Sequence, residues 1–130
     1  MEMEGLSSRI AEINNSAAQT HTRQFEILAK KYSFTYYGKQ SNWYIPWVYY
    51  LKGHYQKAYD KWKWALKNRR RKLHRSVSKE KIKYWMAMSL KRLGNREAAK
   101  DIFLELSQDE YIDYYSIASV QRLKGMIGSR

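Results

Sequence analysis

The sequence predicts an all-α fold, an α-solenoid of antiparallel helix hairpins with about six or seven helices. Apolar and aromatic residues recur at helical spacing, and the same helix–glycine–helix unit recurs along the chain. The single proline and the six glycines fall where helices are expected to turn. We expect one helical-repeat domain over residues 21–130, preceded by a polar N-terminal segment or docked helix over residues 1–20.

The first helix of the repeat domain is marked by a capping residue and an apolar stripe. Thr20 or Thr22 can cap a helix that runs through Tyr32, with apolar residues spaced to share one face. Residues 34–38, Phe-Thr-Tyr-Tyr-Gly, are then either a short connector or the opening of another helix.

A helix hairpin is expected next. Asn42 or Ser41 can cap its first helix, and Pro46 would lie in the first turn, where the backbone N–H groups lack intrahelical partners anyway. After Gly53, the second helix should run over residues 55–67. Its pattern, G-x-Y-x-x-A-x-x-x-aromatic-x-x-A, is that of a tetratricopeptide-like hairpin.

The clearest hairpin covers residues 83–106. Apolar side chains lie on two faces of its first helix, which predicts packing against neighbours on two sides. Gly94 supplies the left-handed turn that ends this helix, and Asn95 can cap the next. Because Gly53 and Gly94 occupy equivalent places, the two hairpins should be copies of one unit that stacks to bury its apolar face.

The final helix repeats the first helix of the clearest hairpin about thirty positions further on. Ser107-x-x-Glu110 resembles a capping box that opens it, and the helix should end near Gly125. If no further hairpin covers this helix, its apolar side chains would invite self-association; these are Tyr114, Ile117 and Val120.

Positive charge is the compositional outlier, with a formal net charge of +13. Such an excess serves solubility or indicates an anionic partner, such as nucleic acid, phospholipid or an acidic polymer. Cysteine is absent, so disulfides and cysteine-based metal sites are excluded. No apolar run approaches the length of a membrane span, and the N-terminus does not have the pattern of a signal peptide.

The charge concentrates between the two hairpins. Residues 68–83 contain a dense run of cations with Glu80 as their only acid, which predicts the tail of one helix, a loop over residues 75–78 and the head of the next. Ser76 or Ser78 should cap that next helix. Trp64 lies off the apolar stripe of its helix and should be exposed, whereas Trp62 and Trp85 should be core residues.

This region supplies the candidate binding residues, because arginine forks and lysines grip phosphates or carboxylates and an exposed tryptophan can stack on a ring. The alternative is a solvated charged face. The predicted polyanion or glycan site consists of Lys61, Lys63, Trp64, Lys67, Arg69, Arg70, Arg71, Lys72 and Arg75.

No catalytic residue, cofactor site or metal site is predicted. The three histidines, His21, His54 and His74, lie far apart, and no glycine-rich phosphate loop or serine nucleophile motif is present. The acidic cluster around Asp109 and Asp113 falls at an expected helix start, where negative charge is ordinarily favourable.

The segment over residues 84–125 resembles the helical superhelix that precedes the catalytic domain of soluble lytic murein transglycosylases. The shared elements are a Y-W-x-A run, a Leu-Gly turn, an E-A hairpin and a Y-Y-x-x-A helix closing in R-L: Tyr84, Trp85 and Ala87; Leu93 and Gly94; Glu97 and Ala98; Tyr114, Tyr115, Ala118, Arg122 and Leu123. The Tyr-Tyr-Gly of residues 36–38 is similar to one that recurs between hairpins of that superhelix.

This resemblance implies a non-catalytic scaffold that supports peptidoglycan binding or turnover, in contact with murein or with its own catalytic domain. The family's catalytic Glu-Ser pair has no counterpart in this sequence, so no catalytic residue carries over. A periplasmic location follows from the family, for a mature chain or fragment. The alternative is a cytoplasmic tetratricopeptide-like adaptor or RNA-binding repeat protein that uses the same basic face on phosphates.

Overall fold

A computed structural model gives the fold of residues 23–32, 35–108 and 113–128. A helix over residues 23–31 comes first. It is followed by α2 (Tyr36–Leu51), α3 (Tyr55–Lys67), α4 (Arg69–Lys72), α5 (Lys79–Arg92), α6 (Arg96–Ser107) and α7 (Tyr114–Gly128). The described residues contain no strand, and the prediction of an all-α fold is confirmed. The polar segment 1–20 lies outside the described residues, as do Thr20, His21, Thr22, Phe34, Asp109 and Glu110.

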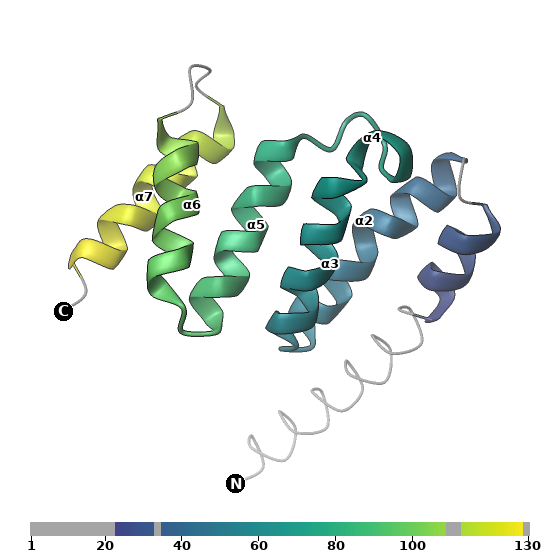
Figure 1. Cartoon of the computed structure of the whole chain (residues 1–130), viewed down its shortest axis with the longest axis horizontal. Helices are drawn as coiled ribbons and strands as arrows, with labels where there is room; N and C mark the ends of the chain where they lie inside the picture. Colours follow the sequence, from purple (N-terminus) through teal and green to yellow (C-terminus); the bar gives the residue numbers. More distant parts are fainter. Residues whose placement is uncertain (1–22, 33–34, 109–112, 129–130) are drawn as a thin grey trace, which may run out of the picture.

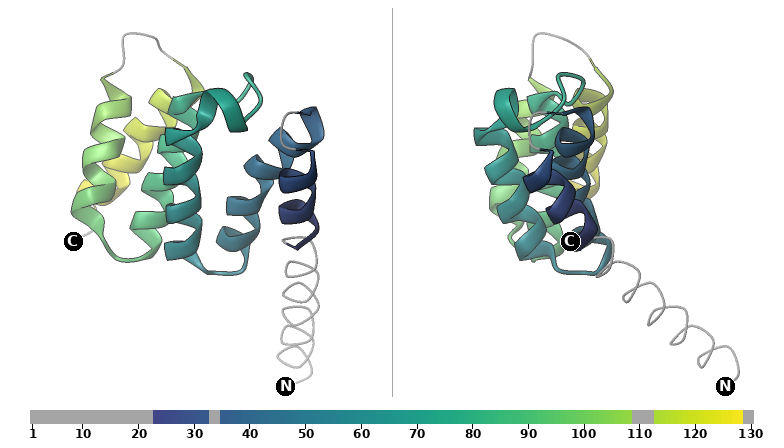
Figure 2. Two further views of the ribbon diagram at one scale, coloured as in Figure 1. Left: turned by 45° about the vertical axis from the view of Figure 1, so that its right-hand side comes forward. Right: turned by 90° about the vertical axis from the view of Figure 1, so that its right-hand side faces the viewer.

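The helices succeed one another side by side across the molecule (Figure 1). α2 packs on α3, and α5 packs on α6, as the two expected hairpins. α3 also packs on α5, while α7 contacts both α6 and α5, so each hairpin is covered by the next element of the chain. The left-hand view in Figure 2 shows the same order. Whether these hairpins form a superhelical solenoid stays a prediction.

The two hairpin turns are built alike. Gly53 and Gly94 have φ values of 82° and 85°, in the left-handed region. The backbone N–H of His54 donates to the carbonyl of Tyr49 at 2.9 Å, and that of Asn95 donates to the carbonyl of Leu90 at 3.0 Å. This six-residue closure after a left-handed glycine is the Schellman motif. The predicted equivalence of the two glycines is therefore confirmed.

The last helix runs slightly past its predicted end near Gly125. Gly125 lies within α7 without a positive φ, and the helix continues to Gly128. A glycine inside a helix weakens it but does not stop it unless the backbone turns left-handed there.

The predicted start of α2 is wrong. The helix begins at Tyr36, and the side-chain oxygen of Thr35 caps it by accepting a hydrogen bond from the third helical N–H at 3.3 Å. Residues 36–38 thus open the helix, which was one of the two predicted alternatives. Ser41 and Asn42 lie buried in the helix interior, and Pro46 lies inside the helix beyond its first turn.

Ser78 caps α5, as one of the two alternatives predicted, because its hydroxyl oxygen accepts from the backbone N–H of Lys81 at 3.2 Å. Asn95 caps α6 in the same way, which confirms that prediction. The basic tail predicted to continue α3 is broken at Asn68, and α4 is a separate short helix.

The expected capping box at Ser107 is wrong, because Ser107 is the last residue of α6. Asp113 and Ser116 cap α7 instead. An Asp113 carboxylate oxygen accepts from the backbone N–H of Ser116 at 2.8 Å, and the Ser116 hydroxyl oxygen accepts from the backbone N–H of Asp113 at 2.9 Å. Two backbone donors at the helix start are satisfied reciprocally.

Two hydrophobic clusters form the core, one on each side of α5. Trp62 is 0% exposed at the centre of the first, and Phe103 is 0% exposed in the second. Trp85 is half-buried between them and packs against both, with its ring 4.3 Å from that of Trp47. The predicted core position of Trp62 and the two-sided packing of this helix are confirmed.

Candidate functional site

The basic surface consists of the eight cationic side chains that α3, α4 and the following loop contribute: Lys61, Lys63, Lys67, Arg69, Arg70, Arg71, Lys72 and Arg75. Most are exposed, while Arg69 and Lys72 are partly buried. α3 ends because Asn68 folds back, donating its side-chain amide to the carbonyl of Trp64 at 2.9 Å. The chain then turns into α4, which places its arginines beside the lysines of α3.

Buried anchors hold this basic surface on the core. Leu73 and Val77 are 1% and 3% exposed and belong to the cluster around Trp62. The side-chain amide of Asn42 donates to the backbone carbonyl of Lys72 at 2.9 Å, which fastens the end of α4 to α2. The loop is therefore a packed connection and not a free solvated strand of charge.

The cations of the basic surface are available to a ligand. Apart from Lys72, they form no ion pair with a carboxylate in the part of the chain that the structure describes. Among the described residues, Lys83 and Glu105 form an ion pair at 2.6 Å, away from the basic surface. Unpaired charges of one sign raise the local potential and attract counterions.

A pocket of about 530 Å³ opens beside the basic surface, between the helix of residues 23–31 and α2, α3 and α4. Its lining combines apolar, aromatic, acidic and basic groups: Glu26, Ala29, Lys30, Asn42, Ile45, Pro46, Asp60, Lys61, Trp64 and Lys72. Trp64 is 41% exposed, so its predicted exposure is confirmed. The pocket therefore brings together Lys61, Trp64 and Lys72 from the predicted site, whereas the other predicted residues lie outside it.

Aromatic contacts hold the outer wall of the pocket. The ring of Phe25 lies 5.5 Å from that of Tyr44, and the hydroxyl of Tyr49 donates to a carboxylate oxygen of Glu26 at 3.5 Å. Burial, reinforced by the charge of Glu26, raises the pKa of Tyr49 above its ordinary value. Tyr49 thus remains a neutral donor to this carboxylate.

The acids of the pocket were not predicted. Glu26 and Asp60 come from different helices, and the sequence contains no motif that joins them. Asp60 accepts a hydrogen bond from the side-chain amide of Gln56 at 3.0 Å. One feature of the sequence could have drawn attention to Asp60: it is the only acid among the lysines of its helix.

A second group of cations surrounds Lys91 at the end of α5. Partial burial lowers the pKa of the Lys91 ammonium below its ordinary value. The charges of Arg122, Arg92 and Arg96 lower it further. Arg122 is held in place because its Nε donates to the hydroxyl oxygen of the buried Tyr84 at 3.1 Å.

Two classes of site are not seen in the described residues. No group of three histidine, aspartate or glutamate side chains is placed there to hold a metal ion. None of the helices described is both long and apolar enough to cross a bilayer.

The described residues define an all-α protein with a basic surface next to a pocket of mixed lining. No protein-family model matches the chain, and no curated protein or solved structure matches it either. The resemblance to the transglycosylase superhelix therefore stays a prediction from the sequence.

Proposed function

We propose that the chain is a non-catalytic helical scaffold that binds an anionic glycan polymer, with peptidoglycan as the polymer that the sequence resemblance suggests. The observation that carries the proposal is the basic surface, in which eight cations lie within fifteen residues without an intervening acid. Seven of them form no ion pair with the described carboxylates. The carboxylates of peptidoglycan stem peptides and muramyl groups would supply the missing partners.

Glycan is favoured over nucleic acid by the composition of the pocket. Glu26 and Asp60 place two carboxylates next to Trp64. Carboxylates accept hydrogen bonds from sugar hydroxyls, of which a glycan offers several per unit and a nucleic-acid backbone at most one. An exposed indole offers its face to the C–H face of a sugar ring. Binding of RNA is the alternative that the test separates.

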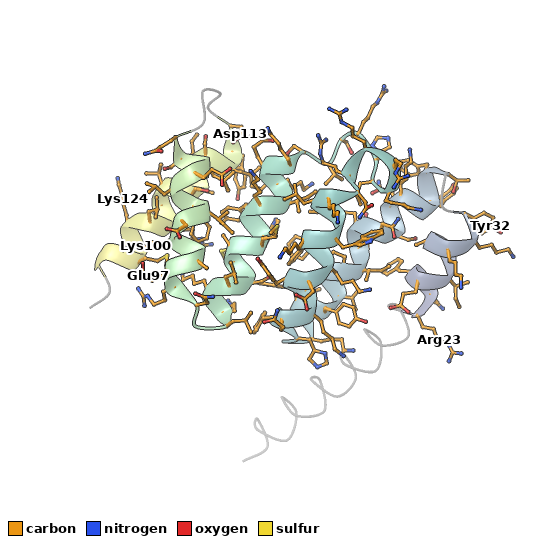
Figure 3. The ribbon with its side chains drawn as sticks, in the orientation of Figure 1. Arg23, Tyr32, Glu97, Lys100, Asp113 and Lys124 are labelled. Carbon is orange, nitrogen blue, oxygen red and sulfur yellow. The ribbon has the colours of Figure 1, made fainter. Side chains whose placement is uncertain are left out.

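The test is retention on purified sacculi with two variants of equal charge. The site variant changes the exposed Arg70, Arg71 and Arg75 to Gln. The control variant changes Arg23, Lys100 and Lys124 to Gln, which lie near the two ends of the molecule (Figure 3). Both variants lower the net charge of +13 by three.

We expect the site variant to bind at least about tenfold more weakly than the control, because three exposed charge contacts at ~0.5 kcal/mol each amount to a factor of about ten. Equal retention of the two variants would refute the proposal. A salt titration with RNA supplies the other outcome. Tight RNA binding with a steep log–log slope, together with unchanged sacculus retention, would assign the surface to nucleic acid.

A further inference from the structure

We infer that the pocket beside Trp64 is a subsite for a single sugar ring that carries one carboxylate, with the ring against the indole and the carboxylate on Lys61. This inference rests on the proposed function, because it names the unit of the glycan that the pocket would hold. It concerns a different set of atoms from the arginines of α4 and the following loop.

The size of the pocket suits one sugar unit. Its volume of about 530 Å³ lies within the range of small-ligand sites, roughly 300–1,000 Å³. A long glycan that crosses the basic surface would place one residue in the pocket.

The exposed apolar wall of the pocket suits one face of a pyranose ring. Trp64 contributes an indole that is 41% exposed from α3, while Ile45 and Pro46 of α2 lie buried at the floor. The C–H face of a sugar ring packs against an aromatic face, and its hydroxyls point outward around the ring edge. Removing the exposed apolar surface of a tryptophan from water is favourable, so a sugar ring that covers the indole gains binding free energy.

Polar groups that accept hydrogen bonds surround this apolar surface. Asp60 and Glu26 are acceptors for sugar hydroxyls. The amide nitrogen of Asn42 is used by the carbonyl of Lys72, which leaves the Asn42 amide oxygen as a further acceptor in the lining. The lining therefore offers acceptors, and its lysines offer donors, to sugar hydroxyls, each of which can donate and accept.

Lys61 supplies the positive charge that a carboxylate on the ligand would meet. The lining holds Lys30, Lys61 and Lys72 together with the carboxylates of Glu26 and Asp60. Lys61 is exposed, stands one turn before Trp64 on α3, and forms no ion pair with the described carboxylates. Its ammonium is therefore the group that would meet a carboxylate on the stacked ring.

The experiment compares two monosaccharides that differ in a carboxylate. N-acetylmuramic acid and N-acetylglucosamine are titrated into the ¹⁵N-labelled chain, and the indole N–H signal of Trp64 is followed, assigned by its loss in Trp64→Phe. We expect N-acetylmuramic acid to shift this signal with a millimolar Kd and N-acetylglucosamine to bind at least about threefold more weakly. Lys61→Gln should remove the difference between the two sugars. Lys63→Gln, exposed on the same helix but outside the pocket lining, should keep it.

The outcomes separate this inference from the proposed function. If neither sugar shifts the Trp64 signal, or if Lys63→Gln acts like Lys61→Gln, the inference is overturned even where sacculus binding holds. If the site variant and its control retain sacculi equally while N-acetylmuramic acid still binds at Trp64, the polymer proposal fails and the subsite stands.

Discussion

The two left-handed glycines of the hairpin turns should be intolerant of alanine. Gly53 and Gly94 have φ values of 82° and 85°, and a Cβ added at either position would meet no atom within 4 Å. Steric clashes with neighbours therefore contribute nothing, and the whole effect comes from the backbone conformation. A left-handed residue with a side chain costs about 1–2 kcal/mol, and the lower entropy of the unfolded chain offsets part of it. We expect each substitution to destabilise the fold by about 1 kcal/mol.

Gly125 provides a matched control in the same chain. An added Cβ would also meet nothing within 4 Å there, but the backbone lacks a positive φ and lies within α7. Alanine is the better helix former, so Gly125→Ala should stabilise the fold by roughly 0.5–1 kcal/mol. The same chemical change is thus expected to have opposite signs at the two kinds of position.

The assay is urea unfolding followed by circular dichroism at 222 nm, with free energies from linear extrapolation and a check that the slope is unchanged. Gly53→Ala and Gly94→Ala should lower the midpoint, and Gly125→Ala should raise it. If all three variants shift the midpoint in the same direction, backbone conformation does not explain the effect of replacing these glycines. The assignment of the two turns as equivalent would then lose its physical basis.

Three other substitutions test separate parts of the fold. Asp113→Ala should cost about 1 kcal/mol in urea unfolding because it removes the cap of α7, whereas Ser107→Ala should change stability by less than ~0.5 kcal/mol. Phe103→Ala, at a side chain that is 0% exposed, should cost ~3–5 kcal/mol, against less than ~0.5 kcal/mol for the 49% exposed Leu104. Lys91→Gln should raise Tm at pH 7. The folded pKa of Lys91 is lowered from 10.5, so its charge destabilises the fold at neutral pH and this penalty disappears as the pH rises to 10.5. The difference in Tm between Lys91→Gln and the unchanged chain should vanish above that pH. A difference that stays constant with pH would show that the charge of Lys91 is not its cause.

Local patterns were sufficient to predict the hairpins, because a glycine turn and its flanking apolar stripes lie within one stretch of chain. The start of α2 was mispredicted for a non-local reason. Asn42 has the chemistry of a cap, but its amide is used by the carbonyl of Lys72, thirty residues further on. Thr35, which caps the helix, is a capping residue type like Ser41 and Asn42 and is distinguished from them only by its place in the chain. Several polar residues could begin a helix, and packing decides among them.

The candidate site was predicted only in part, because its local features are visible in the sequence and its long-range contacts are not. Trp64 could be placed on the surface because it lies off the apolar stripe of its own helix, and the basic run is visible in the sequence itself. The pocket could not be predicted, since Glu26 and Asp60 meet only when the helix of residues 23–31 docks on α2. That docking involves the ring contact between Phe25 and Tyr44, about twenty positions apart. The periodicity of apolar residues within one helix cannot predict such a contact.

The basic surface is anchored on the core at several points. Leu73 and Val77 are inserted into the core on either side of Arg75. Asn42 holds the end of α4 from the opposite side. A backbone anchored in this way loses less conformational entropy when a ligand binds, so more of the contact energy would appear as affinity. The fold thus bears the repulsion of clustered charge in the free chain, and an anionic polymer laid across it would relieve that repulsion.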